Sequence, residues 1–138
     1  MKLCYPACFY QNKETGFYVV EVPDLPGCGS GGHTLAEAIL MGIDAASGWI
    51  LTEMEEGRPV PPPGTIESTE PEEEGGFVDV LLLDIEEYSK KYGRQLIDKT
   101  LKIPAYLSTF ADEQKIDISK IAQEALSQLY QDHQVASG

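Results

Sequence analysis

The stretch "VPDLPGCGSGGHT", from Val22 to Thr34, decides how the first half of the chain folds. It overlaps the end of Phe17–Val22, a run rich in aromatic and β-branched residues that predicts a strand. Its two prolines end that strand, and its glycines allow a tight turn with close approach of the backbone. The Thr34 hydroxyl can cap a helix, and Glu37, three residues later, completes a capping box. We therefore expect a structural turn that leads into a helix, with room for a short third strand in residues 27–32.

The same stretch also carries Cys28 and His33, which a small enzyme could use as nucleophile and base. These residues lie five positions apart across a glycine run, and the only other histidine, His133, is close to the C-terminus. Two ligands do not complete a zinc site, because no CxxC or HxxxH pattern accompanies them. We therefore expect no catalytic residue, no metal and no cofactor, and we keep a small enzyme that uses Cys28 or the acidic residues as an alternative.

The remainder of the first half predicts a small sheet with one long helix across a face. Residues Leu3–Tyr10 alternate between two faces as a strand does, and Pro6 favours an edge or a bulge. After Thr34, apolar residues recur at helical spacing as far as Ile50, so one face of the helix is apolar.

A long loop separates this helix from the last strand of the first half. Residues 57–76 are rich in proline, glycine and glutamate and predict an exposed, mobile loop. Phe77–Ile85 is so apolar that it predicts a buried strand. Residues 1–87 therefore form one predicted domain of the α+β class, with the order β-β-β-α-β.

Charge is divided unevenly along the chain. Residues 1–87 hold 3 basic and 17 acidic side chains, a net charge of −14, whereas residues 88–138 hold 7 basic and 6 acidic, a net charge of +1. An acidic region of this kind repels nucleic acid and attracts a basic protein. The two parts are therefore expected to have different partners.

Length and cysteine content limit the number of domains and the cellular compartment that we expect. The 138 residues favour one domain, or one small domain plus a smaller appendage. No run approaches the roughly 18 apolar residues that a membrane span needs, and the first residues do not form a signal peptide, so we expect a cytoplasmic protein with no membrane partner. The three cysteines are then expected to be reduced thiols.

Residues 93–138 predict a second domain with a strand and two helices. On the strand Ile97–Ile103, Leu101 and Ile103 share one face, and alternate residues point the other way. Pro104 suits the first turn of one helix, and Ser119 is a good N-cap for the next. Elements this small cannot bury a full core alone, so we expect a two-fold dimer in which the strands pair antiparallel.

This strand–helix–helix spacing resembles the ribbon-helix-helix DNA-binding fold over about Ile97–Gln131. A two-stranded ribbon fits the major groove, where its outward side chains read base edges. The start of the second helix can present N–H groups and a lysine to a phosphate. An acid at an outward strand position departs from this pattern, because it repels phosphate. The candidate DNA-binding residues are Thr100, Lys102, Asp98, Ser119 and Lys120.

The first half resembles the HicB family of antitoxins. It carries "YPACFY", then "GFYVVEVPDLPGCGSGGHTLAEAI", and then "GRPVPPP" after the helix. The resemblance implies a reduced RNase H-like domain and a type II antitoxin that neutralises a basic, mRNA-cleaving HicA-type toxin and represses its own operon. It also implies a toxin-facing rim, for which the candidates are Glu21, Asp24 and Leu25. A dimeric adaptor that binds protein only, with no DNA role, stays as a further alternative.

An RNase H-like fold raises the question of nuclease activity. That chemistry needs acids clustered on adjacent strands to hold divalent metal ions. The predicted first strand, Leu3–Tyr10, contains no acid, so Asp79 on the last strand of the domain lacks a partner. We therefore expect that the protein is not an enzyme.

Overall fold

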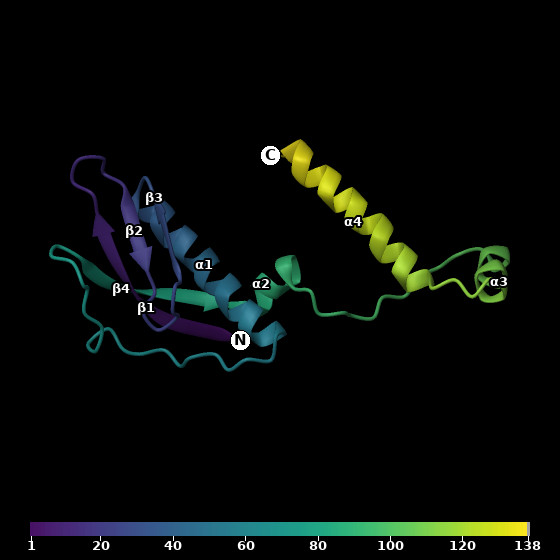
Figure 1. The fold of residues 1–138 in the computed structure, drawn as a ribbon, viewed down its shortest axis with the longest axis horizontal. Helices are drawn as coiled ribbons and strands as arrows, with labels where there is room; N and C mark the ends of the chain where they lie inside the picture. The colour runs from purple at the N-terminus through teal and green to yellow at the C-terminus, as the bar shows by residue number, and fades with distance from the viewer. Residues whose placement is uncertain (138) are drawn as a thin grey trace. The chain divides into compact units, whose positions relative to one another are not determined.

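The structure, a computed structural model, describes residues 1–137. It contains two compact units, which we call unit 1 (residues 1–96) and unit 2 (residues from 97 onward). Unit 1 contains β1 (Lys2–Gln11), β2 (Tyr18–Glu21), β3 (Gly29–Gly32), α1 (Leu35–Glu55), β4 (Phe77–Asp84) and α2 (Ile85–Tyr92) (Figure 1). Unit 2 contains α3 (Ala105–Glu113) and α4 (Ile118–Ser137). The α+β class and the β-β-β-α-β order of the first half are confirmed.

Helix α2 was not predicted, and it belongs to unit 1. Its N-cap is Asp84, the last residue of β4, whose Oδ1 accepts a hydrogen bond from the Glu87 N–H at 3.2 Å. Residues 88–92, which sequence analysis left between two domains, therefore continue the folded first half.

The sheet is fully antiparallel in the order β3-β2-β1-β4, so β1 lies in the middle. Strand β1 pairs with β4 from Lys2 to Phe9, but it pairs with β2 only from Cys8 onward. Two residues beyond the Cys8–Glu21 pair, the same register would place Pro6 opposite Pro23. Neither proline has an N–H to donate, so the ladder stops there and β2 leaves the sheet. Pro6 thus lies where β1 has a neighbour on one side only, in agreement with its predicted preference for an edge.

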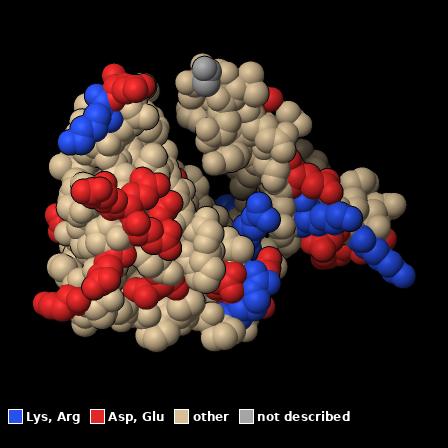
Figure 2. Space-filling model, turned by 60° about the vertical axis from the view of Figure 1, so that its left-hand side comes forward, with Lys and Arg blue, Asp and Glu red and all other residues tan. Residues whose placement is uncertain are grey.

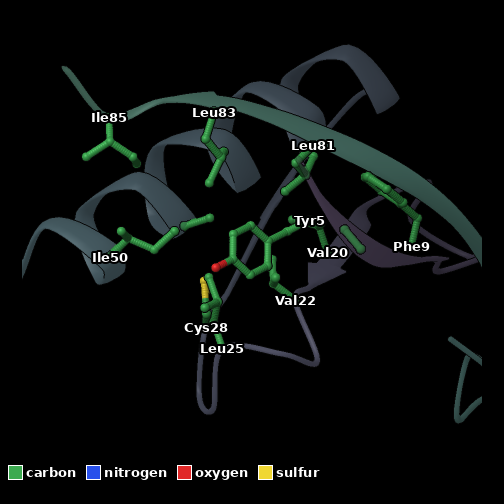
Figure 3. Packing of buried hydrophobic residues seen from close by; sticks show 12 residues of the cluster. Tyr5, Phe9, Val20, Val22, Leu25, Cys28, Ile50, Leu81, Leu83 and Ile85 are labelled. Atoms are coloured by element: carbon green, nitrogen blue, oxygen red, sulfur yellow. The ribbon is translucent and has the colours of Figure 1, made fainter. Parts of the chain in front are cut away.

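The segment Pro23–Cys28 folds over the end of the core that β2 leaves open. Its turn is closed by backbone hydrogen bonds, including Leu25 N–H to Val22 O at 3.0 Å and Cys28 N–H to Leu25 O at 2.9 Å. The Leu25 side chain is fully buried and points with Cys28 toward the ring of Tyr5 (Figure 3). The opening stretch of the sequence is therefore a structural plug, as expected of a turn.

Helix α1 covers one face of the sheet. Thr34 Oγ1 accepts a hydrogen bond from the Glu37 N–H at 3.1 Å, which confirms the predicted cap. Its buried side includes Ala38, Ala46 and Ile50, together with Gly42, where a Cβ would lie only 3.2–3.3 Å from Val20 and Leu81. By length and composition α1 could cross a membrane, but this packing makes it the core helix of unit 1.

The loop of residues 57–76 has no helix or strand and is largely exposed, as predicted. It is nevertheless tied to the unit at three places. The Tyr5 hydroxyl donates to the Pro61 carbonyl, the Gly64 N–H donates to the Asp24 carboxylate at 2.8 Å, and the Glu72 N–H donates to the Tyr10 hydroxyl at 3.0 Å. The loop is thus held at Tyr5 and Tyr10 of β1 and at Asp24.

Two details of unit 2 differ from the sequence prediction. Residues 93–104, including the predicted strand Ile97–Ile103, form no strand in the single chain. The physical reason is that a strand needs a neighbour for its backbone groups, and one copy of unit 2 offers none. Ser119 is not the N-cap of α4, because the helix begins at Ile118 and the Asp117 carboxylate accepts from the Lys120 N–H at 3.1 Å.

The plug predicts a large difference between two leucines of unit 1. Leu25→Ala leaves a cavity in the core, so the free energy of unfolding should fall by about 2–5 kcal/mol. Leu40→Ala is the matched control, because Leu40 is 66% exposed whereas Leu25 is 0% exposed, and its effect should stay below about 0.5 kcal/mol. Urea unfolding followed by the fluorescence of Trp49, the only tryptophan, measures both. Equal effects at the two sites would show that Leu25 does not close the core.

Candidate functional site

Unit 2 presents a set of apolar side chains to solvent. Among the described residues of α3 and α4, only Ala111 is buried. The exposed apolar side chains come from the extended segment and from both helices. They include Leu101, Ile103, Leu107, Phe110, Ile121, Leu126 and Leu129. A single copy of unit 2 therefore lacks a hydrophobic core, and its apolar surface is available to another chain.

The three candidate DNA-binding residues before α3 lie in this extended segment. Asp98, Thr100 and Lys102 are exposed, and no hydrogen bond or ion pair is found for their side chains among the described residues. Alternation along an extended chain places them opposite Leu101 and Ile103. This alternation is compatible with a polar row of Asp98, Thr100 and Lys102 that faces away from the apolar row of Leu101 and Ile103.

The two candidates in α4 have a different setting. Ser119 and Lys120 are exposed in the first turn, but the Lys120 N–H donates to the carboxylate of Asp117. A carboxylate at a helix N-terminus occupies the position that a phosphate would take. A phosphate would have to displace Asp117, so the Lys120 side chain is the better candidate contact there.

The three candidate residues of the toxin-facing rim differ in exposure and in contacts. Glu21 is exposed on β2, and its backbone pairs with Cys8 of β1. Asp24 is half-buried and uses its carboxylate to hold the long loop at Gly64. Leu25 is fully buried in the core and cannot offer its side chain to a partner, so its assignment to the rim was wrong.

Strand β4 provides a surface that sequence analysis missed. It was expected to be buried, but only Leu81 and Leu83 are buried, whereas Val80 is 37% and Leu82 is 60% exposed. The two exposed side chains lie on the face of the sheet opposite α1, which we call the outer face. Register places Val80 and Leu82 beside Pro6 and Cys4 of β1 on that face.

Unit 1 is rich in acidic side chains. Residues 1–96 hold 6 basic and 17 acidic side chains, a net charge of −11, and acids gather over the visible face of this unit (Figure 2). Two of the six bases are already paired: Arg58 contacts Glu53 and Glu56, and Lys90 contacts Glu87. Unit 1 therefore carries a negative field that attracts a basic partner.

The residues proposed for an enzyme are not assembled into a site. Cys28 is buried, and burial raises the pKa of its thiol, which disfavours the thiolate that a nucleophile needs. His33 is exposed and packs edge-on against the ring of Phe17. A shallow depression of about 430 Å³ lies beside Cys28, and it is lined by Gly27, Cys28, Gly29, Ala45, Gly48, Trp49, Thr52 and Glu53 but not by His33.

Acids that could hold a metal are not clustered. Within residues 1–137, no group of three or more histidine, cysteine, aspartate or glutamate side chains has a geometry that fits a metal ion. Asp79 pairs with Ala7 in the sheet, and β1 places no acid near it. Unit 1 thus lacks the paired carboxylates of an RNase H-type centre.

Comparison with known proteins gives a consistent result. The family model of the HicB-like antitoxin of bacterial toxin–antitoxin systems matches residues 5–125. An uncharacterised 14.9 kDa protein of the rep–hol intergenic region of Haemophilus phage HP1 is 38% identical over 85 residues, which are 60% of this chain and 62% of the phage protein. The chain thus spans less than two thirds of the length of that relative.

Two solved structures are similar. A toxin–antitoxin complex from Streptococcus pneumoniae contains a chain that matches with a TM-score of 0.64 at 24% identity, over 93% of this chain and 99% of that one, and this likeness concerns the fold alone. A complex of the toxin HicA3 and the antitoxin HicB3 contains a chain with a TM-score of 0.50 at 28% identity, over 59% of this chain and 99% of that one.

Proposed function

The chain belongs to the HicB-like antitoxins of bacterial toxin–antitoxin systems, and from this premise we propose that it binds and neutralises a HicA-type, mRNA-cleaving toxin in the cytoplasm and represses its own operon. An antitoxin acts by binding, which is a non-enzymatic role. The buried Cys28 and the unclustered acids of unit 1 agree with that role. We interpret unit 1 as a reduced RNase H-like fold that serves as a binding module.

The proposed binding of toxin by unit 1 is carried by one observation, its net charge of −11 with most acids at the surface. A toxin that cleaves mRNA must contact phosphates, so its surface is basic where it binds RNA. An acidic antitoxin surface attracts that region and speeds the encounter. The matched HicA3–HicB3 complex shows that a related chain is found with a toxin of this type.

We propose that unit 2 is a homodimer of the ribbon-helix-helix type. One copy exposes Leu101 and Ile103 as well as apolar side chains of α3 and α4, and among the described residues of these two helices only Ala111 is buried. Antiparallel pairing of two Ile97–Ile103 segments would satisfy their backbone groups and join the apolar side chains of both copies in one core.

We further propose that this dimer binds DNA. Pairing would present two copies of Thr100 and Lys102 on one ribbon face, which suits a palindromic site read through the major groove. Asp98 on the same face and Asp117 at the start of α4 both oppose phosphate. These two acids favour the alternative, a dimeric adaptor that binds the toxin without a DNA role, and the DNA measurement below separates the two.

Toxin binding should be separable from dimerisation. Residues 1–96, which include α2 and the Arg94 N–H bonded to Glu55, should capture a HicA-type toxin. Association should slow as salt rises, because screening weakens the steering field. A pull-down and stopped-flow binding at several salt concentrations test this, with residues 97–138 as the control fragment. Capture by the control and not by residues 1–96 would contradict the proposal.

Three variants test the DNA role. Lys102→Ala should lower the discrimination between operator and unrelated DNA by about 1–3 kcal/mol, because a contact to guanine is lost. Lys120→Ala should weaken binding to all sequences alike and flatten the salt dependence, as loss of a phosphate contact does. Asp98→Asn should tighten binding generally if Asp98 only repels phosphate, and relax specificity at one base pair if it accepts from cytosine.

The measurement is binding of the full chain to the region upstream of its own gene across a salt series. Wild-type protein that binds no sequence specifically at any salt would remove the repressor role and leave the adaptor.

A further inference from the structure

Strand β4 is a free edge of the sheet. It pairs with β1 alone, whereas the opposite edge is the short Gly29–Gly32 strand that packs against α1. The Ile85 N–H donates to the Met1 carbonyl at 3.0 Å, so odd-numbered residues here direct their backbone groups toward β1. Because the direction alternates, the backbone groups of Val78 and Leu82 point away from the sheet.

In the middle of this edge, one outward-pointing backbone N–H has a side-chain acceptor. The Val80 N–H, which also points outward, is accepted by the neighbouring Asp79 carboxylate at 2.7 Å. No such partner is found for the N–H groups of Val78 or Leu82 among the described residues. Natural edge strands usually carry charged side chains, especially lysine, or proline or a bulge that prevents pairing. "FVDVLLLD" has no lysine or proline, and in the described part of the chain its exposed Asp79 accepts only the Val80 N–H.

The exposed side chains of β4 on the outer face are apolar, whereas the exposed Asp79 belongs to the alternate row of the strand. Val80 and Leu82 lie on the outer face beside the exposed Cys4. The loop does not close over this end, because its contact with the outer face is at Tyr10, where the Glu72 N–H binds. An apolar strip thus adjoins a row of free backbone groups.

Acids bracket the strip at both ends. Before β4 the loop carries Glu70, Glu72, Glu73 and Glu74, and after it come Asp84, Glu86 and Glu87. An antiparallel pairing of two β4 strands would bring these two acidic groups against each other. The charge pattern therefore disfavours a second copy of this chain and fits a partner strand flanked by lysine or arginine.

We propose that β4 is the docking edge for the toxin: a strand of the basic partner adds to β4 and its apolar side chains cover Val80 and Leu82. This inference rests on the proposed function and names the surface that performs it. Main-chain hydrogen bonds to Val78 and Leu82 give affinity in such an arrangement, and the exposed side chains and acidic ends give specificity.

A matched pair of variants of the full chain tests the surface. Leu82→Arg places a charge at the centre of the strip, and Leu40→Arg makes the same change on α1 at a similar exposure, 66% against 60%. Titration with the purified toxin should show binding roughly 30-fold weaker for Leu82→Arg, the loss expected at an interface centre, and a change below about twofold for Leu40→Arg. Circular dichroism and Trp49 fluorescence check that both variants are folded.

The outcomes separate the surface from the function. Loss of binding by Leu40→Arg with retention by Leu82→Arg would overturn the β4 surface and leave the antitoxin role intact. Failure of the wild type to bind the toxin at all would refute the proposed function and this inference with it.

Amide hydrogen exchange resolved by residue tests strand addition independently of any variant. The amides of Val78 and Leu82 should exchange fast in the free protein and at least about tenfold more slowly in the complex, whereas those of Leu81 and Leu83 should be protected in both. Unchanged exchange at Val78 and Leu82 in the complex would overturn strand addition. Protection of these two amides in the free protein at high concentration would instead assign the edge to a second copy.

Discussion

The ladder between β1 and β4 is the constraint on which the rest of unit 1 depends. It holds β1 from Lys2 to Phe9, whereas the ladder to β2 ends where Pro6 and Pro23 would meet without a donor. This end releases the chain into the Pro23–Cys28 plug and leaves a gap that the plug and the long loop close together. It also gives β4 a paired side toward β1 and an unpaired side toward solvent.

The two units follow opposite routes to stability. Unit 1 buries a contiguous core within one chain, from Tyr5 and Phe9 on β1 to Ile50 on α1. Unit 2 exposes most of its apolar side chains and buries only Ala111 in its helices, so we propose that another chain completes its core. The charge division matches this contrast, because unit 1 has a net charge of −11, whereas residues 97–138 hold 4 basic and 6 acidic side chains, a net charge of −2.

Local signals in the sequence were sufficient to predict the helix cap and the strand end that depend on nearby residues alone. Thr34 caps α1, the prolines end β2, and the order of unit 1 is as predicted. The start of α2 also had a local signal, since Asp84 stands three residues before Glu87, but the apolar strand that precedes it dominated the pattern. The exposure of Val80 and Leu82 had no such signal, because it depends on whether another element covers the outer face of the sheet.

Candidate residues were predicted less well than helices and strands, because their setting depends on the assembled fold and not on local sequence. Burial of Leu25 depends on the gap left by β2, which only the register of the sheet reveals. The segment Ile97–Ile103 forms no strand in the single chain, and its proposed pairing needs a second chain. The row of Asp98, Thr100 and Lys102 therefore remains a prediction from alternation alone.

The central claim is that unit 1 is complete in one chain and unit 2 is not. Its most direct test is amide hydrogen exchange of the full chain over a dilution series, with the oligomeric state measured by sedimentation. We expect the amides of β1 and β4 that pair with each other to stay protected at every concentration, and those of α3 and α4 to lose protection as the dimer dissociates. Protection of α3 and α4 that persists in a sedimenting monomer would contradict the account.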